Sequence, residues 1–181
     1  MNREPIVLND YGIVLRQLTH DKIEMVRRWR NDPKISQYME FREMITPEMQ
    51  ERWYQKISTS GKDFFFIIEV GGKEIGLTNV RDVDFEKKEG IPGIFIWDDD
   101  YLNSDYSFRS SLCLMDFVFY TLGLERMVTH ILRDNKRAID FNLFWGYEMS
   151  PGQEDVYNQE YTLSKEKYGA VRVKLLRIFK R

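Results

Sequence analysis

Two stretches of the sequence carry side chains that could do acid–base chemistry. Asp98, Asp99 and Asp100 form an acidic run that directly follows an apolar segment. His130 lies in the middle of a second apolar segment. A carboxylate or an imidazole that faces a cleft can act as a general base, directly or through a water molecule. The simpler alternatives are a solvated turn for the acidic run and a hydrogen-bonded interior position for His130.

The sequence lacks the standard signatures of several enzyme classes. It has no G-x-x-x-x-G-K-[ST] phosphate loop and no G-x-S-x-G nucleophile motif, which excludes P-loop nucleotide enzymes and the usual esterases. A single cysteine, Cys113, rules out an internal disulfide framework. Because there are only two histidines besides, a Cys/His zinc site is disfavoured, and we expect no bound metal.

The composition is that of an ordinary globular protein. Of 181 residues, 43% are hydrophobic and 31% charged, so we expect one folded domain over residues 1–181. Lys and Arg number 27 against 29 Asp and Glu, a net charge of −2, which argues against a nucleic-acid binder. No stretch approaches the roughly 18 apolar residues of a membrane helix, and no targeting segment is visible. Since the chain has one free thiol, we expect a cytoplasmic location.

Patterns in the first half of the chain predict the elements that precede the acidic run. Residues 12–18 read as a short apolar strand, and a helix capped by Thr19 or Asp21 follows and ends before Pro33. A second helix is predicted over residues 46–61, with a capping threonine, a first-turn proline and a terminal glycine. Apolar runs separated by a Gly-Gly turn and a charged turn then predict three strands, over residues 64–70, 73–80 and 91–97.

In the second half of the chain, helices and strands alternate. We expect a loop over residues 101–107, an apolar helix over 108–122, a strand over 126–132, a helix over 135–145, and strands over 147–157 and 159–164. The tail, residues 168–181, is predicted to be a basic helical extension with an apolar face. Such a tail could contact a membrane surface or nucleic acid. The simpler interpretation is that its apolar face docks on the sheet or on a second copy of the chain, in a homodimer.

This order of elements predicts an α/β (α+β) fold, in which helices cover a mixed sheet. The hairpin over residues 64–80 is antiparallel, whereas the later strands alternate with helices. The order lacks the regular alternation of a doubly wound dinucleotide-binding fold.

A series of segments along the chain carries a family resemblance. The segments are Leu15-Arg16-Gln17-Leu18, Trp29-Arg30-Asn31-Asp32-Pro33, Ile45-Thr46-Pro47-Glu48, Gly71-Gly72-Lys73-Glu74-Ile75-Gly76, Leu122-Gly123-Leu124-Glu125-Arg126 and Phe144-Trp145-Gly146-Tyr147. In this order and spacing they resemble the GNAT family of acetyl-CoA-dependent N-acetyltransferases. More narrowly, they resemble the branch that contains ribosomal-protein-alanine and amino-sugar N-acetyltransferases. The resemblance implies a mostly antiparallel, twisted sheet of about seven strands flanked by helices.

The resemblance also implies an acetyl-CoA site between the fourth strand and the long helix. In the family, a glycine-rich loop there offers backbone N–H groups to the pyrophosphate, and the helix N-terminus adds its positive end. Here Asp105 stands at the first glycine position, Arg109 is its candidate counter-charge, and Asn142 stands where many members have a tyrosine acid. The implied cofactor-binding residues are Phe95, Ile96, Trp97, Asn103, Ser104, Asp105, Tyr106, Ser107, Arg109, Asn135 and Asn142.

By the same resemblance, the first two helices and the loop between them flank the acceptor. The implied substrate-binding residues are Trp29, Arg30, Asn31 and Tyr38, and the candidate catalytic residues are Asp98, Asp99 and His130. We therefore expect an N-acetyltransferase that acts by direct attack in a ternary complex. Its acceptor would be an amino-sugar nucleotide, a protein N-terminus or a small amine. The alternative is a catalytically silent GNAT-like binding or scaffold domain that has lost normal acetyl-CoA binding.

Overall fold

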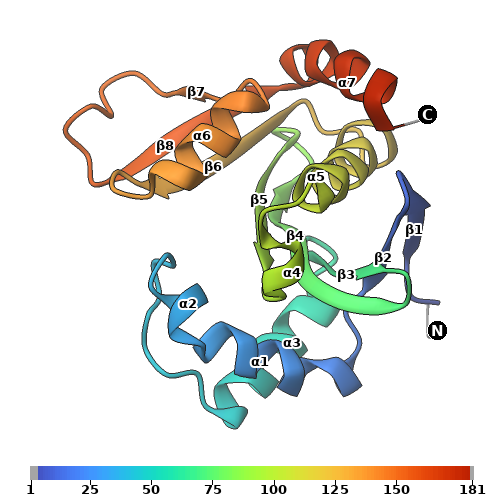
Figure 1. Ribbon diagram of the computed structural model, residues 1–181. Helices are drawn as coiled ribbons and strands as arrows, with labels where there is room; N and C mark the ends of the chain where they lie inside the picture. The colour runs from blue at the N-terminus through green and yellow to red at the C-terminus, as the bar shows by residue number, and fades with distance from the viewer. Residues whose placement is uncertain (1–3, 180–181) are drawn as a thin grey trace. The chain divides into compact units, whose positions relative to one another are not determined.

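The computed structural model describes residues 4–179, which form a mixed eight-stranded sheet with helices (Figure 1). The strands are β1 (Val7–Asp10), β2 (Ile13–Gln17), β3 (Phe64–Val70), β4 (Lys73–Asp84), β5 (Glu89–Ile96), β6 (Arg126–Leu132), β7 (Glu148–Met149) and β8 (Asn158–Ser164). Their order in the sheet is β1-β2-β3-β4-β5-β6-β8-β7. The β5–β6 pair is parallel, whereas β1–β2, β2–β3, β3–β4, β6–β8 and β7–β8 are antiparallel. The predicted fold class is confirmed.

Helices connect these strands. They are α1 (Ile23–Asn31), α2 (Pro33–Ser36), α3 (Pro47–Ser60), α4 (Asp99–Leu102), α5 (Tyr106–Asp116), α6 (Lys136–Phe144) and α7 (Lys165–Phe179). A 3₁₀ turn, His20–Lys22, precedes α1, and a π-helical turn, Phe117–Thr121, continues α5. Within residues 4–179, no helix is both long enough and apolar enough to cross a membrane.

Internal contacts divide the described chain into two compact units. Unit 1 holds residues 4–81 and 93–114, and unit 2 holds residues 82–92 and 115–179. The single domain expected over residues 1–181 stays a prediction, and its residues 1–3 and 180–181 lie outside the described part of the chain.

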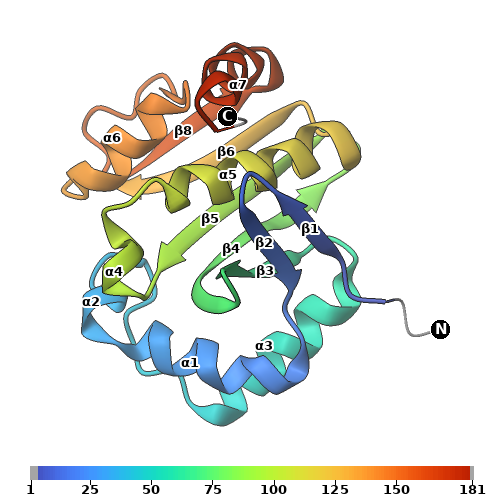
Figure 2. The same ribbon diagram turned by 45° about the vertical axis from the view of Figure 1, so that its right-hand side comes forward.

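In unit 1, helices α1 and α3 lie side by side and pack on the antiparallel strands (Figure 2). Alternate residues of β3, Phe65 and Ile67, point to the same face of the sheet and are buried there. Ile23 and Val26 of α1 and Ile57 of α3 complete this apolar cluster from the helical side. The cluster fixes the helices against the strands and so positions the residues at the end of α1.

Local signals in the sequence explain the boundaries of α3 and of the β3–β4 hairpin. Thr46 caps α3, because its hydroxyl accepts a hydrogen bond from the backbone N–H of Met49 at 3.2 Å. Gly61 ends the helix with φ at 65°, a value that few other residues adopt. Gly71 and Gly72, with φ at 56° and 82°, make the turn between the two strands. These predicted elements are confirmed.

Unit 2 is organised by the antiparallel β6–β8 pair and by helix α7. The pair runs in register from Arg126 opposite Ser164 to Leu132 opposite Asn158. Tyr168 of α7 is buried and stacks on Phe119, with ring centroids 5.0 Å apart. Thus the helical tail was correctly predicted. It begins at Lys165, and its basic residues Lys180 and Arg181 lie outside the described part of the chain.

The tail packs on the end of α5 and on the π-helical turn that follows it, within its own unit. Arg172 Nε and Nη2 lie 2.6 and 2.9 Å from the carboxylate oxygens of Asp116, and the Tyr168 hydroxyl donates to the same carboxylate. One of the basic residues is therefore used in an internal ion pair. A homodimer formed through this helix stays a prediction.

The predicted loop over residues 101–107 is wrong. Helix α4 spans Asp99–Leu102, and α5 already begins at Tyr106. The acidic run that ends the preceding strand also starts α4, because Asp98 caps it by accepting a hydrogen bond from Asp100 N. An aspartate that interrupts a strand pattern is also a preferred helix N-cap, and the sequence pattern alone did not separate the two roles.

Other boundaries also differ from the predicted ones. The strand expected over residues 147–157 is confined to Glu148–Met149. The charged turn expected over residues 82–90 is shorter, since β4 continues to Asp84 and β5 begins at Glu89. Strand β1 was not predicted at all; it pairs with β2 through a turn at Tyr11 and Gly12, whose φ values are 56° and 74°.

Candidate active site

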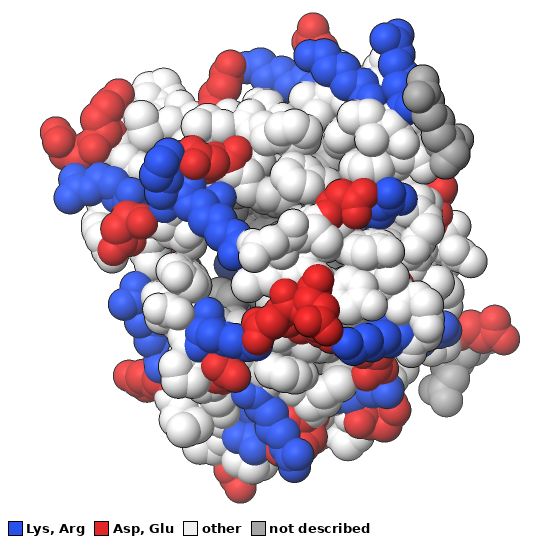
Figure 3. Space-filling view, in the orientation of Figure 1, with Lys and Arg blue, Asp and Glu red and all other residues white. Residues whose placement is uncertain are grey.

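The acidic run of unit 1 starts α4, and two lysines pair with it. Asp98 Oδ1 accepts a hydrogen bond from the backbone N–H of Asp100 at 3.1 Å. Lys73 Nζ lies 2.6 Å from Asp98 Oδ2, and Lys34 Nζ lies 2.9 Å from Asp99 Oδ1. In Figure 3, a group of acidic side chains stands where Figure 1 places α4, with basic side chains beside it. The run is therefore ion-paired, which a plain solvated turn would not require.

This pairing bears on the ability of these carboxylates to accept a proton. The hydrogen bond from Lys73 lowers the pKa of Asp98. A carboxylate with a lowered pKa is a weaker proton acceptor near neutral pH. Asp99, whose side chain is 75% exposed, is also held by a lysine, Lys34. The role of Asp98 or Asp99 as general base stays a prediction.

An open hollow of about 500 Å³ adjoins the acidic run in unit 1. On its wall, Trp29 and Trp97 stack with their ring planes 1° apart and their centroids separated by 5.8 Å. Lys34 Nζ lies 5.2 Å from the centre of the Trp29 ring, in a cation–π contact. Aromatic faces next to carboxylates suit a ligand that carries an ammonium group. The lining residues are Met25, Trp29, Lys34, Lys73, Glu74, Trp97, Asp98, Asp99 and Asp100.

The end of β5, a predicted part of the cofactor site, is held firmly by β4. The indole Nε1 of Trp97 donates a hydrogen bond to the backbone oxygen of Glu74 at 3.0 Å. A Cβ at Gly76 would lie 2.6 Å from the backbone oxygen of Phe95, so this close approach requires glycine. Ile96 and Trp97 are buried, and Phe95 is partly buried. The three residues thus have fixed positions, and their contact with a cofactor stays a prediction.

The turn between α4 and α5 is closed by its own side chains. Asn103 forms the C-cap of α4, and the Ser104 hydroxyl donates to the backbone oxygen of Tyr101 at 2.5 Å. The same hydroxyl accepts a weak hydrogen bond from the backbone N–H of Tyr106, at 3.4 Å. Ser107 follows in the first turn of α5. The turn therefore keeps a defined conformation without the glycines that the family usually has there.

Asp105, at one of those glycine positions, is paired with Arg109. Arg109 Nε and Nη2 each lie 2.8 Å from Asp105 Oδ2. Arg109 Nη1 also donates to the backbone oxygen of Tyr11 at 2.9 Å, which anchors the guanidinium. The predicted counter-charge is therefore present one helical turn after the aspartate. A neutralised carboxylate repels a phosphate much less than a free one does.

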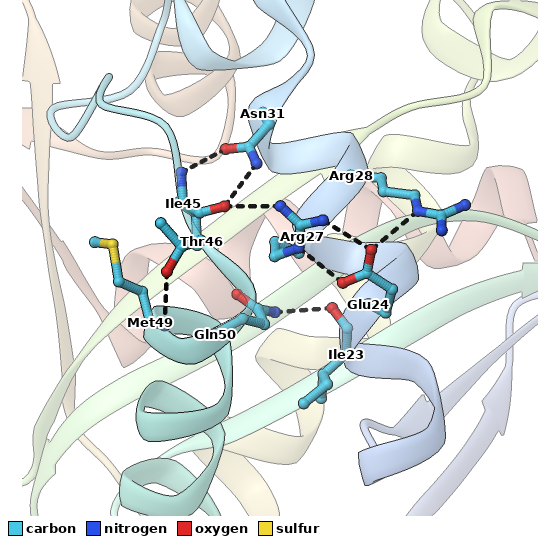
Figure 4. A network of polar contacts seen from close by, with 9 residues as sticks. All are labelled: Ile23, Glu24, Arg27, Arg28, Asn31, Ile45, Thr46, Met49 and Gln50. Atoms are coloured by element: carbon cyan, nitrogen blue, oxygen red, sulfur yellow. Dashed lines mark hydrogen bonds and ion pairs between the residues drawn. The ribbon is translucent and has the colours of Figure 1, made fainter.

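The last turn of α1 is tied to the start of α3 by a polar network (Figure 4). Asn31 Oδ1 accepts from the backbone N–H of Ile45 at 2.8 Å, and its Nδ2 donates to the backbone oxygen of Ile45 at 2.9 Å. Arg27 donates to the same oxygen and pairs with Glu24, whose pKa falls to about 2, chiefly through the hydrogen bond from Arg27. Gln50, from α3, donates to the backbone oxygen of Ile23. Asn31 thus holds the interhelical loop, and its role in substrate binding stays a prediction.

The remaining candidates for acceptor binding differ in exposure. Tyr38, in the loop that Asn31 anchors, is 56% exposed. Arg30 is partly buried, and its Nη1 atom has no hydrogen-bond partner among the described residues. Burial lowers the pKa of Arg30. This guanidinium differs from the neighbouring one of Arg27, which has a carboxylate partner.

The candidates in unit 2 lie on β6 and α6. His130 is exposed, so the interior position is wrong; its Nε2 lies 3.8 Å from Glu160 Oε2 on the paired strand. Asn135 caps α6, because its Oδ1 accepts from the backbone N–H of Ala138 at 3.1 Å. Asn142 Nδ2 donates to the backbone oxygen of Ala138 at 2.8 Å. Both amides therefore serve α6 itself, and their contact with a cofactor stays a prediction.

Sequence reasoning missed the two lysines of the hollow. Lys34 lies in the short helix α2, which was not predicted, and Lys73 was taken only as part of a hairpin. Their one sequence signal is opposite charge to the acidic run. That signal is weak, because the chain contains 27 Lys and Arg in total.

Comparison with known proteins identifies the family from the sequence, and solved structures share the fold. A family model described as "Acetyltransferase (GNAT) domain" matches residues 13–141. Among curated proteins, none matches the chain by sequence. The interval covered by the family model includes α1, the acidic run, the α4–α5 turn and His130.

Several solved structures share the fold, among them a GNAT and an N-acetyltransferase. The nucleotide-linked sugar GNAT FdhC, in its apo form, has a TM-score of 0.79 and 22% identity, over 96% of this chain and 98% of that one. Spermidine N-acetyltransferase from Vibrio cholerae, in complex with CoA and spermine, has a TM-score of 0.76 and 17% identity, over 88% of this chain and 99% of that one. A domain from Methanocaldococcus jannaschii has a TM-score of 0.72 and 18% identity, over 84% and 97%.

Proposed function

Because this chain belongs to the GNAT acetyltransferase family, we propose that it is an N-acetyltransferase. It moves an acetyl group from acetyl-CoA to a primary amine by direct attack in a ternary complex. The observation that carries this proposal is the Asp105–Arg109 pair at the start of α5. It offsets the charge that would otherwise oppose a pyrophosphate at the α4–α5 turn.

The residues at this turn fit the acetyl-CoA that the family uses. Backbone N–H groups in the first turn of a helix have no intrahelical acceptor and carry the positive end of the helix dipole. Ser107 lies in the first turn of α5, and Asn103 and Ser104 lie just before the helix. We assign these residues and Arg109 to the pyrophosphate, and Phe95–Trp97 to the pantetheine arm. When bound, acetyl-CoA supplies an activated acetyl thioester.

The hollow beside α4 is our candidate for the acceptor amine. Its carboxylates, Glu74 and Asp98–Asp100, outnumber its two lysines, so a cationic amine is favoured there over a neutral one. The cation–π contact between the Lys34 ammonium and the Trp29 ring supports this assignment, because an acceptor ammonium would make the same kind of contact. An acceptor ammonium must lose a proton before it attacks, so the reaction needs a general base, for which Asp98, Asp99 and His130 are the candidates.

Catalytically silent binding is the second candidate function. Asn142 stands where many family members place a tyrosine acid, and its amide bonds to the helix backbone instead. An amide can donate a hydrogen bond but delivers no proton to a leaving thiolate. A domain of this kind would bind its ligands without turning them over.

We expect the protein to bind acetyl-CoA. This expectation distinguishes a domain with a working cofactor site from one that has lost that site. A ligand present at 100 times its Kd stabilises the native state by about 2.7 kcal/mol. For a chain of this size, that corresponds to a rise in Tm of roughly 5–10 °C. The measurement is thermal unfolding with and without millimolar acetyl-CoA, beside a GNAT acetyltransferase of known activity. If the known enzyme shifts and this chain does not, the acetyl-CoA site proposed above is absent.

A further inference from the structure

Arg30 lies on the face of α1 that packs on the apolar cluster of unit 1, a face that it shares with Arg27. It follows Ile23 by seven residues and Val26 by four, so the three side chains share one side of the helix. Ile23 and Val26 are buried in the cluster that α1 forms with β3. The Arg30 side chain is partly buried at this position, whereas that of Arg28, on another face, is 75% exposed.

The Arg30 guanidinium lacks the partner that comparable arginines of this chain have. Its Nη1 atom is buried and donates to no acceptor among the described residues, 4–179. Arg27, Arg109 and Arg172 are also partly buried, and each of them pairs with a carboxylate. Arginine stays protonated at any working pH, so Arg30 is a partly buried positive charge without a carboxylate partner among the described residues. Such a group destabilises the free protein unless a ligand completes it.

We infer that Arg30 receives an anionic group, a phosphate or a carboxylate, of the acceptor whose amine is acetylated. This inference rests on the proposed function. The guanidinium offers a planar set of N–H donors that matches the oxygens of both groups in a bidentate contact. The preceding residue, Trp29, lines the hollow assigned to the amine. The acceptor class is therefore an amine that also carries an anion, such as a nucleotide-linked amino sugar or an amino acid, and excludes simple polyamines.

Unfolding experiments test Arg30 without any requirement for turnover. Arg30→Met removes the unpaired charge and keeps an apolar side chain of similar length. We expect the free variant to have a higher Tm than the parent, by a few degrees. Diphosphate and succinate serve as the anion probes, and at least one of them should raise the Tm of the parent by more than that of Arg30→Met. Diphosphate can still stabilise Arg30→Met through the site assigned to the acetyl-CoA pyrophosphate, so the comparison is between the two responses. The probe with the larger difference identifies a phosphate or a carboxylate as the group.

Two further variants control this experiment. Arg30→Gln keeps a polar side chain without the charge and should also respond less to the anion than the parent does. Arg28→Met removes an exposed arginine from the same helix and should respond to the anion as the parent does. A lower Tm of Arg30→Met, or equal responses of Arg30→Met and the parent to both anions, would overturn the inference, because Arg30 would then be a structural residue.

Acceptor kinetics separate this inference from the proposed function. If the protein transfers acetyl groups, Arg30→Met should raise the KM for an anionic acceptor at least tenfold and leave the KM for acetyl-CoA unchanged. In the control variant Arg28→Met, both KM values should equal those of the parent. Preference of the parent for spermidine over every anionic amine would contradict the inference while leaving acetyl transfer intact. Absence of all transfer, together with the anion-dependent Tm shift, would contradict the proposed function alone.

Discussion

Replacing His130 with glutamine is expected to lower kcat by about 10²- to 10⁴-fold and to leave the KM for acetyl-CoA unchanged. The imidazole is the side chain that ordinarily titrates nearest to neutral pH, and in this chain it is exposed on β6. The carboxylate of Glu160 lies 3.8 Å from its Nε2 atom. By contrast, Asp98 and Asp99 are each paired with a lysine, and the hydrogen bond from Lys73 lowers the pKa of Asp98.

The chain offers a matched control for this variant. His20 is also exposed, and its Nε2 lies 2.8 Å from a carboxylate oxygen of Glu51. His20→Gln should therefore keep the turnover of the parent, measured as the steady-state release of CoA. Unchanged turnover in His130→Gln would return His130 to a surface role. A large loss in Asp98→Asn or Asp99→Asn instead would assign the base to the acidic run.

Arg109→Ala is expected to weaken acetyl-CoA binding by tenfold or more. The substitution leaves Asp105 without its counter-charge at the turn assigned to the pyrophosphate. Two like charges about 4 Å apart repel by about 1 kcal/mol in water and by about 4 kcal/mol at an effective dielectric constant near 20. Asp105→Gly should tighten binding severalfold, because it removes the negative charge and frees the backbone.

The two substitutions form a double-mutant cycle that titration calorimetry can follow. Since Arg109 Nε lies 2.8 Å from Asp105 Oδ2, the effects on Kd should not add. Arg109→Ala should cost less affinity in the Asp105→Gly background than in the parent. Lys136→Ala breaks a similar i,i+4 ion pair, with Asp140 at the surface of α6, and should leave Kd unchanged. An unchanged Kd in both Arg109→Ala and Asp105→Gly would place the pyrophosphate elsewhere.

Helices and strands with strong local signals were predictable from the sequence. The Thr46 cap, Pro47 and Gly61 define α3, and the Gly71-Gly72 turn defines the β3–β4 hairpin, because each of these residues restricts the backbone by itself. The α4–α5 turn was not predictable in the same way. There, the acidic residues that end a strand pattern also cap a helix, and only the fold shows that both happen.

In the candidate site, contacts between residues close together in the sequence were predictable. Contacts that depend on the tertiary fold were not. Arg109 follows Asp105 by four residues, one helical turn, so their pairing could be anticipated from spacing although Asp105 lay in the predicted loop. Lys34 precedes its partner Asp99 by 65 residues, a separation that no local pattern spans. Lys73 likewise reaches Asp98 from a different element. The structural use of Asn31 as a clamp on Ile45 depends in the same way on a tertiary contact.

The most direct test of the account is whether the protein transfers an acetyl group. The full chain is incubated with acetyl-CoA and, separately, a nucleotide-linked amino sugar, an amino acid, a peptide with a free N-terminus, or spermidine. Released CoA is titrated as free thiol, and the amine product is identified by mass spectrometry. We predict one N-acetylated amine for each CoA released, at a rate proportional to protein concentration. Binding of acetyl-CoA without an acetylated product from any of these amines would contradict the account and favour the silent binding domain.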